Sequence, residues 1–491
     1  MSKKSAIVIG SGFAGLSVAT NLAAGGFDVD IFEKNDSPGG RARKFQAEGF
    51  TFDMGPSWYW MPDVFENYFE SFGKKVADYY TLNRLDPSYS VFFEKDRLDI
   101  PASFNELCAL FEKYEPGSSK GLIKFLDEAE YKYEVGINDL VYKPGLAFTE
   151  FLDWRVISGA FRLQLINSLS SHVRKYFKHP YLIELLEFPV LFLGAKPSKT
   201  PALYSLMNYA DIKLGTWYPE GGMNKIVEGM VSLAEEMGVK IHTSSPVEKI
   251  TTEKGEAKGV MVNGRTHTAD VVVSGADYHH TEQNLLAPDE RNYSSKYWES
   301  RTMAPSSILY YVGLNKKVPE LEHHNLFFDA DFNQHAEDIY ENPNWPENPL
   351  FYVSVTSKTD PTVAPENCEN LFILIPTAPG LMENSKIKDH YFKVVMDRME
   401  QKLEQSIREH VIFKREFACS NFIEDYNSFK GNAYGLANTL KQTAILKPSL
   451  KNKKVKNLFY TGQLTVPGPG VPPSLISGKV VADQIIKAHL S

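Results

Sequence analysis

The chain has few cysteines and no long hydrophobic run. Its three cysteines, Cys108, Cys368 and Cys419, lie far apart and include no CxxC pair. This spacing excludes a disulfide framework, a zinc ribbon and a disulfide reductase, and the odd number fits a reducing compartment. The longest apolar stretch, residues 182–195, is interrupted by two glutamates and a proline. No segment therefore reaches the roughly 18 uninterrupted apolar residues of a membrane-spanning helix.

The chain also has fewer basic than acidic residues. Lys and Arg total 53 against 61 Asp and Glu, giving a net charge of -8. A nucleic-acid binder needs surplus cations, so no nucleic-acid partner is expected. The sequence has no P-loop and no second GxGxxG, which argues against a separate nicotinamide domain. The pairs His279-His280 and His323-His324 lack the i, i+4 spacing of helical metal ligands, so no metal site is predicted.

The remaining composition is that of a globular protein. Hydrophobic residues make up 43% and charged residues 23% of 491 residues, a length that predicts more than one domain. The 31 Phe, 25 Tyr and 6 Trp indicate large cores or a site for an extended apolar ligand. The apolar residues 6–10 are too few for a signal peptide, so a cytoplasmic protein is expected.

The strongest motif is Gly-Ser-Gly-Phe-Ala-Gly at residues 10–15. It lies between a predicted strand at 5–10 and a predicted helix at 13–24, and a second strand is predicted at 27–32. Together these elements form a βαβ unit, which is the context that a dinucleotide-binding GxGxxG requires.

Each glycine of this motif has a separate predicted role. Gly10 allows a tight turn, Gly12 lets the backbone approach a pyrophosphate, and Gly15 lets the helix pack closely on the strand. The helix N-terminus then offers free N–H groups and partial positive charge to phosphates. Glu33, at the end of the second strand, is placed to hold ribose hydroxyls, and a carboxylate there argues against NADP.

The other elements favour an α/β fold with a discontinuous Rossmann-like nucleotide-binding domain and two insertions. Patterns predict hairpins at 44–53 and 88–100, a helix at 104–114, a helix and strands over 223–275, strands at 307–313, 371–376 and 455–461, and helices at 390–410 and 473–489. The predicted domains are the nucleotide-binding domain (1–75, 220–290 and 450–491), an α+β substrate domain (76–110 and 291–449) and a helical subdomain (111–219).

The helical subdomain contains a segment, residues 161–199, in which basic and bulky apolar residues alternate. Arg174, Lys175, Lys178 and Lys196 are its cations. Two interpretations stay open. The segment docks on a membrane surface, with cations toward headgroups and apolar groups inserted, or it is an ordinary helical region with a solvated face.

Further motifs at both ends of the chain carry a family resemblance. Gly39-Gly40-Arg41 follows Glu33, and Asp53-Met54-Gly55-Pro56 follows the first hairpin. Residues 457–473 read NLFYTGQLTVPGPGVPP and are followed by SLISGKVVADQI. These motifs resemble the FAD-dependent amine-oxidase-like superfamily. The PGxGVP and SGK patterns are similar to those of its bacterial-type phytoene desaturases, a carotenoid desaturase family, and the motif order matches along the whole chain.

The resemblance implies FAD as cofactor, in a nucleotide-binding domain of the GR2 type. Arg41 matches the arginine that lies near the FAD phosphates, and the last helix would point its N-terminus at the flavin pyrimidine edge. No catalytic side chain is predicted. The predicted cofactor-binding residues are Gly10, Ser11, Gly12, Ala14, Gly15, Glu33, Lys34, Gly40, Arg41, Gly55, Pro56, Ser57, Val247, Gly462, Gln463, Gly470, Val471 and Pro472.

The implied activity is that of a phytoene desaturase, which introduces C=C bonds into a linear C40 carotene by hydride transfer to flavin N5. Alternatives on this scaffold are a later-acting desaturase of the 1-hydroxycarotenoid 3,4-desaturase type, a carotene isomerase and a retinol-saturase-like enzyme. An amine oxidase and a non-enzymatic lipid-binding escort protein are the alternatives outside this class. The expected partners are a hydrophobic polyene, the inner face of a membrane, and oxygen or a quinone as electron acceptor.

Overall fold

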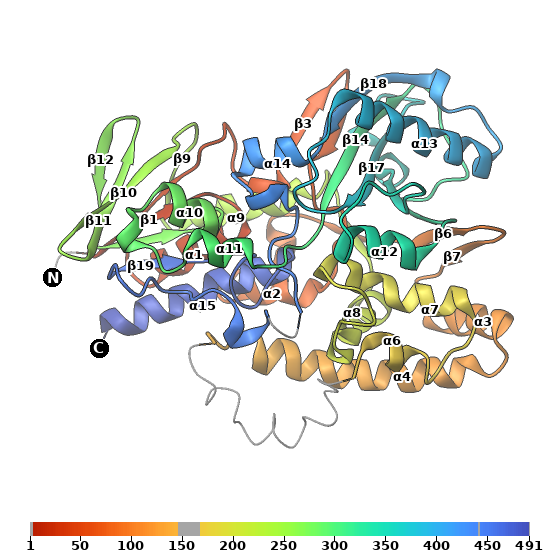
Figure 1. Ribbon diagram of the computed structural model, residues 1–491, viewed down its shortest axis with the longest axis horizontal. Helices are drawn as coiled ribbons and strands as arrows, with labels where there is room; N and C mark the ends of the chain where they lie inside the picture. Colours follow the sequence, from red (N-terminus) through yellow and green to blue (C-terminus); the bar gives the residue numbers. More distant parts are fainter. Residues whose placement is uncertain (1–2, 146–166, 440–441, 491) are drawn as a thin grey trace.

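The structure, a computed structural model, describes residues 3–145, 167–439 and 442–490. Two sheets and a group of helices surround the centre of the molecule (Figure 1). A parallel sheet lies near both termini, a larger mixed sheet lies above and to the right, and the helices lie below it.

The parallel sheet is assembled from three separate stretches of chain. Its strand order is β19-β13-β1-β2-β9, and all neighbours run parallel. The strands β1, β13 and β19 are almost wholly buried, as expected for a parallel sheet covered by helices, whereas the edge strand β9 is partly exposed. The bounds are β1 Ser5–Ile9, β2 Asp28–Phe32, β9 Lys240–His242, β13 Val271–Ser274 and β19 Leu458–Tyr460. The helices α1 (Phe13–Ala24), α9 (Asn224–Glu236) and α15 (Val471–Leu490) accompany it, and α1 packs against both of the others.

The mixed sheet has seven strands in the order β18-β14-β17-β16-β15-β6-β7. Only β15 and β6 pair in parallel, and the strands β6 and β7 come from a part of the chain far from the others. The bounds are β6 Tyr89–Phe93, β7 Arg97–Ile100, β14 Ser306–Leu314, β15 His324–Phe328, β16 Phe351–Ser354, β17 Glu369–Thr377 and β18 Val411–Phe417. The helix α13 (Ser385–Leu403) packs its apolar side on one face of this sheet.

Smaller elements connect these parts. A three-stranded antiparallel sheet lies at the far left of Figure 1, and two short hairpin-like pairs lie elsewhere. The bounds are β3 Lys44–Ala47 with β4 Phe50–Asp53, β5 Leu82–Arg84 with β8 Trp217–Pro219, and β10 Val247–Glu253, β11 Glu256–Val262 and β12 Arg265–Thr268. The short helices are α10 Tyr278–Asn284, α11 Ser295–Glu299, α12 Phe332–Tyr340 and α14 Cys419–Tyr426.

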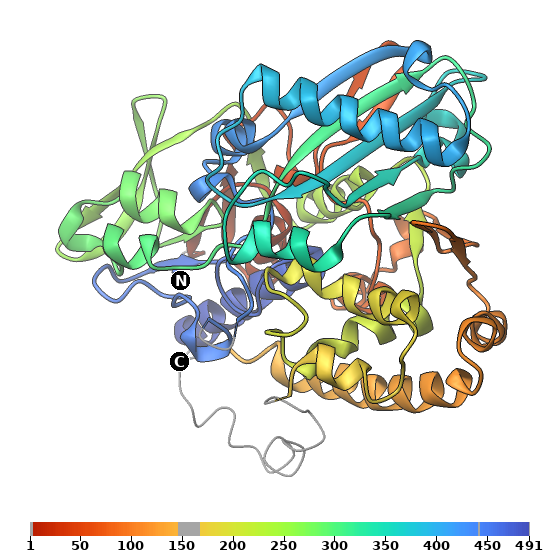
Figure 2. The same ribbon diagram turned by 45° about the vertical axis from the view of Figure 1, so that its right-hand side comes forward.

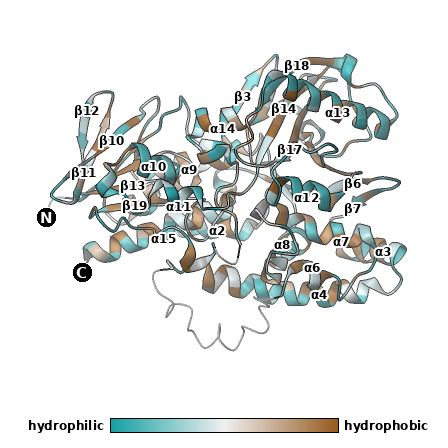
Figure 3. Cartoon of the chain, viewed as in Figure 1, coloured by the Kyte–Doolittle hydropathy of each residue, from teal (hydrophilic) through white to brown (hydrophobic). Residues whose placement is uncertain are grey.

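The helical group occupies the lower right, and the second view shows the same arrangement (Figures 1 and 2). Hydrophilic and hydrophobic residues alternate along α4, as they do in an amphipathic helix (Figure 3). The bounds are α2 Pro62–Glu70, α3 Phe104–Tyr114, α4 Ser118–Tyr133, α6 Leu169–Val173, α7 Pro180–Glu187 and α8 Leu206–Tyr209. Within the described ranges, no helix has both the length and the apolar character needed to cross a membrane.

Two predicted helices have different bounds in the structure. The helix predicted at 390–410 is α13, which ends at Leu403 because Glu404 adopts a left-handed conformation with φ 51°. It begins earlier than predicted because the Asn384 side chain caps it, accepting a hydrogen bond from Ile387 N at 3.0 Å. The last helix begins at Val471 rather than at Pro473.

The basic segment is described only from residue 167 onward, since residues 161–166 lie outside the described residues. In this part, Arg174 pairs with the buried Glu187, and Lys196 pairs with Glu337 at 3.0 Å. Six large apolar side chains of this part lie in the protein core and are not available to insert into a bilayer; they are Phe177, Leu182, Leu185, Leu186, Phe188 and Val190. Lys175 and Lys178 are exposed.

Candidate active site

The glycine loop between β1 and α1 has the geometry of a phosphate cradle. Gly10 has φ +89°, a left-handed conformation that suits glycine. A Cβ on Gly15 would lie 2.0 Å from the Gly10 carbonyl oxygen, so only glycine allows this approach of helix to strand. A Cβ on Gly12 would meet nothing within 4 Å, so the backbone there faces open space at the start of α1. This opening fits a pyrophosphate.

Glu33 lies beside this loop at the end of β2 and is nearly buried. One carboxylate oxygen accepts hydrogen bonds from Ser11 N and Ser11 Oγ at 2.9 and 2.8 Å. The other accepts from Asn35 N and Asn35 Nδ2 at 2.9 and 3.0 Å. These four contacts hold the carboxylate at the cavity wall beside the glycine loop.

Arg41 lines the same cavity and extends from the segment that follows Glu33. Gly55 lets the chain pass close to it, because a Cβ there would lie 2.5 Å from the Arg41 carbonyl oxygen. Its Nη2 donates to Ser428 Oγ at 3.1 Å, and its guanidinium lies 5.2 Å from the Tyr426 ring centroid. Burial lowers the pKa of Arg41, and the nearby Asp277 opposes that shift. Among the described residues, its buried Nε has no hydrogen-bond partner, which fits a donor that would bind a cofactor phosphate.

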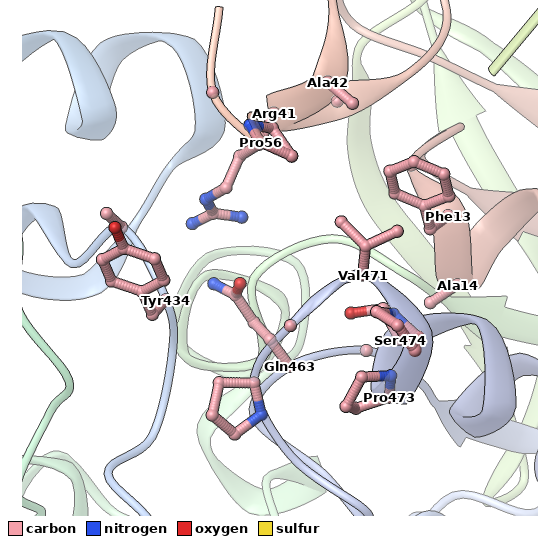
Figure 4. Close-up of a pocket in the computed structure, with 18 of the residues that line it drawn as sticks. Phe13, Ala14, Arg41, Ala42, Pro56, Tyr434, Gln463, Val471, Pro473 and Ser474 are labelled. Atoms are coloured by element: carbon pink, nitrogen blue, oxygen red, sulfur yellow. The ribbon is translucent and has the colours of Figure 1, made fainter. Parts of the chain in front are cut away.

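Figure 4 shows how the C-terminal loop meets this arginine. Arg41 extends toward Gln463, while Val471 and Ser474 at the start of α15 lie near Phe13 and Ala14 at the start of α1. With its amide oriented to satisfy both neighbours, Gln463 accepts from Arg41 Nη1 and Nη2 at 3.2 and 3.0 Å and donates to the Tyr434 carbonyl at 3.3 Å. Two helix N-termini and one arginine thus converge on one space.

This space is a cavity of about 950 Å³, near the upper end for ligand pockets. All of the predicted cofactor-binding residues line it except Ser11 and Gly15. Ser11 instead holds Glu33, and Gly15 packs against Gly10. Lys34, which lines the cavity, donates its ammonium to the Glu424 carbonyl at 2.5 Å. The structure therefore brings together residues from four distant stretches of chain, in an arrangement that fits an extended dinucleotide.

The other half of the cavity is largely apolar and aromatic. It lies against the mixed sheet, where Leu309, Leu374 and Tyr352 form one row across β14, β17 and β16. Trp58 and Trp60 also line this half, with ring centroids 5.1 Å apart, and the Trp58 ring lies 5.5 Å from that of Tyr352. Further lining residues of this half are Met61, Leu140, Val141, Leu203, Leu206, Met207 and Phe372.

Buried polar groups hold the two tryptophans in place. Trp60 Nε1 donates to Thr216 Oγ1 at 2.9 Å, and that hydroxyl donates to Asp211 at 3.1 Å. Burial raises the pKa of Asp211 to about 6. Trp58 stacks on His324 with 4.2 Å between ring centroids. The aromatic wall is therefore rigid before any ligand binds.

The sequence-based prediction missed Asp277 and the aromatic wall. Asp277 follows β13, lines the cavity, and caps α10 by accepting from His280 N at 3.0 Å. Burial raises its pKa to about 6, although Arg41 opposes the shift. Its position after the buried strand 271–274 and the Gly275-Ala276 step is a signal that could have placed it at the carboxyl edge of the sheet. The aromatic wall has no such local signal.

The fold and site define a flavin-dependent oxidoreductase, and comparisons with known proteins agree. Residues 13–486 match the family described as flavin containing amine oxidoreductase. The chain is 42% identical, over 99% of both chains, to a carotenoid 3,4-desaturase of Haloarcula japonica. It is 34% identical to a zeta-carotene-forming phytoene desaturase of Myxococcus xanthus, covering 98% of this chain and 93% of the relative. An oxidoreductase structure from Methanosarcina mazei shares the fold, with a TM-score of 0.64 and 17% identity over 98% of this chain and 100% of that one.

The chain therefore belongs to the carotenoid desaturase family within the flavin containing amine oxidoreductases. It is an FAD-dependent oxidoreductase, and its fold is the expected α/β fold with a discontinuous nucleotide-binding domain. This excludes the non-enzymatic escort protein considered above.

Proposed function

We propose that the protein removes two hydrogens from a linear carotenoid and so introduces a C=C bond. The observation that carries this proposal is the single cavity in which the residues of a dinucleotide site continue directly into an apolar, aromatic chamber. Bound FAD supplies a hydride acceptor at N5. A long polyene fits a chamber of this kind because its recognition depends on shape and burial rather than on polar contacts.

The chain's own residues would act mainly by positioning. The aromatic side chains of Trp58, Tyr352 and Phe372 line the chamber. The face of an aromatic ring attracts positive charge, so these rings would stabilise the charge that develops along the polyene when a hydride leaves. The apolar lining would also exclude water and hold the target bond in one orientation. Gly10, Gly12, Glu33 and Arg41 would hold the dinucleotide.

We further propose 3,4-desaturation of an already desaturated linear carotenoid, rather than the first steps on phytoene. The 42% identity to a carotenoid 3,4-desaturase supports this choice. Within the described part of the chain, two buried polar atoms of cavity-lining residues, Trp58 Nε1 and Ser307 Oγ, also have no hydrogen-bond partner. A hydroxyl-bearing carotenoid could satisfy such groups, whereas a pure hydrocarbon could not. Phytoene desaturation is the second candidate, supported by 34% identity to a phytoene desaturase.

Expression in pigment-producing hosts tests the choice. One host accumulates phytoene, and a second accumulates a linear carotenoid that carries a hydroxyl at its saturated end. The proposal predicts an added double bond, with a red-shifted pigment, in the second host only. Coloured products from phytoene would instead establish the second candidate. The variant Gly12→Asp serves as the inactive control in both hosts.

We also propose that the enzyme works at the inner face of a membrane, because a carotenoid dissolves in lipid, and that oxygen or a quinone reoxidises the flavin. The exposed Lys175 and Lys178 support contact with an anionic surface.

A further inference from the structure

Lys447 is a buried lysine with no partner among the described residues. Its exposed fraction is 5%, and its Nζ donates no hydrogen bond to any residue that the structure describes. Burial alone lowers the pKa of Lys447 to about 7. An ammonium without a counter-ion is costly to bury. Methionine or leucine would fill this buried position better than lysine does. Packing alone therefore does not explain why a lysine is present here.

The surroundings of Lys447 connect it to the cavity. A Cβ built on Gly468 would lie 3.2 Å from Lys447 Nζ and 2.9 Å from Asn438 Oδ1, so both groups meet at this point of the C-terminal loop. Asn438 Oδ1 is also buried and has no hydrogen-bond partner in the ranges that the structure describes. Asn438 lines the cavity, as do Pro467 and Pro469 on either side of Gly468. Lys447 therefore lies directly behind one part of the cavity wall.

A second source of positive potential lies beside it. The helix α15 begins at Val471, three residues after Gly468, and runs for 20 residues. Its N-terminus carries partial positive charge and faces the same part of the cavity as Gly470 and Val471. The sequence motifs predict that the flavin pyrimidine edge lies against the loop 466–470 and the start of α15. The role proposed next for Lys447 rests on this part of the proposed function.

We propose that Lys447 is a positioning residue of the flavin site, acting through Asn438 and the loop 466–470 on the charge of the flavin. In desaturation, one hydrogen of the substrate would leave with both electrons as hydride to the flavin, and the neighbouring carbon would lose its hydrogen as a proton as the C=C bond forms. The reduced ring would then carry one negative charge. The negative charge favours the ammonium form of Lys447, and that ammonium in turn stabilises the charge. Asn438, whose side chain lies beside Gly468 together with Lys447 Nζ, forms the part of the cavity wall through which the charge acts.

Sulfite binding to the holoenzyme measures this effect without any carotenoid. Sulfite adds to N5 of oxidised flavin and leaves negative charge on the ring, so its affinity reports the positive potential around the pyrimidine edge. Lys447→Met removes the charge at similar side-chain length. We expect sulfite to bind about tenfold more weakly, and a tenfold loss in the two-electron reduction equilibrium corresponds to a midpoint potential about 30 mV lower. Lys447→Arg should restore most of both values.

The exposed Lys453 provides the matched control, since Lys453→Met removes a charge from the same region of the chain. Lys447→Gln is the second neutral variant, for use where the methionine variant folds poorly. Unchanged sulfite affinity and potential in FAD-loaded Lys447→Met or Lys447→Gln would overturn the inference and leave the desaturase proposal intact. A wild-type protein that binds no FAD would instead overturn the account of the site itself.

Discussion

Gly12 and Gly15 belong to one motif, but one is needed for ligand binding and the other for the fold. Gly12 has an ordinary φ of -71° and faces open cavity, so it is needed for the ligand and not for the fold. Gly15 is needed for the fold, because any side chain would strike the backbone at Gly10. The two positions therefore separate cofactor binding from stability.

Gly12→Asp should abolish FAD binding while the apoprotein keeps its thermal stability. The added carboxylate would occupy the space for the pyrophosphate and repel its charge. Gly15→Val should instead destabilise the protein by about 1–3 kcal/mol or more, because of overpacking. Flavin absorbance of the purified variants and their melting temperatures measure both effects. A Gly12→Asp protein that retains full flavin would contradict this assignment.

Asp277 provides a test that depends on pH. Its folded-state pKa is raised from 3.8 to about 6 by burial, so it favours the protonated form in the folded protein. Its contribution to stability is therefore complete below pH 3.8 and is lost as the pH rises through about 6. Asp277→Asn keeps the cap on His280 N and cannot ionise.

Between pH 4 and pH 7, the apoprotein of Asp277→Asn should gain up to about 3 kcal/mol of unfolding free energy relative to the wild type. Denaturant unfolding at several pH values gives this difference, with Asp289→Asn, an exposed position, as control. A difference that stays constant across this range would show that Asp277 does not titrate in the folded state near pH 6.

At the level of elements, the C-terminal loop and α15 complete the site. Gly470 has φ +111°, and a Cβ there would lie 3.2 Å from Pro473 Cδ. The prolines at 472 and 473 fall in the first turn of α15, where a missing N–H costs nothing. The loop that ends at Gly470 therefore forms part of the cavity wall and also leads into the first turn of α15.

Gly470→Val should reduce turnover by at least about tenfold with a smaller effect on folding, because a β-branched residue resists positive φ and its side chain would project beside the site. Gly73 makes a good control, since it has φ +73° with no atom near its Cβ and lies far along the chain. Gly73→Val should suffer the same backbone strain and keep its turnover per flavin. Equal turnover in both variants would place the loop away from the chemistry.

The proposed contact with a membrane surface involves the connection between α6 and α7, which contains Lys175 and Lys178. Replacing Lys175 and Lys178 with glutamate should weaken binding to anionic vesicles several-fold, at about 1 kcal/mol per charge near a surface, without loss of FAD. Lys249 and Lys254, exposed on the three-stranded sheet, are control positions. Vesicle binding that does not change would show that this segment is an ordinary solvated helical region.

Elements close in sequence were predicted well, and contacts between distant elements were not. The βαβ unit, the hairpins and the helix after Ser103 follow from local patterns. The end of α13 was misplaced because amphipathic periodicity continues past Leu403, where the backbone at Glu404 turns. The aromatic wall depends on contacts of Trp58 with His324 of β15 and of Trp60 with Thr216, 156 residues further along the chain, and no local pattern encodes such contacts.

For the whole molecule, the decisive feature is the continuity of the cavity. One end lies at the carboxyl edge of the parallel sheet, and the other lies against the mixed sheet, so the two sheets meet across the expected reacting centre. The chain reaches this arrangement by contributing three separate stretches to the parallel sheet. Hydride transfer from a buried polyene needs this combination of a dinucleotide site and a dry chamber.

Anaerobic mixing of the purified holoenzyme with a linear carotenoid in vesicles tests the central claim most directly. The account predicts that flavin absorbance bleaches and that one new C=C bond forms for each FAD reduced, with Gly12→Asp giving neither signal. A flavin that stays oxidised with every linear carotenoid offered, or that an amine reduces instead, would contradict the account.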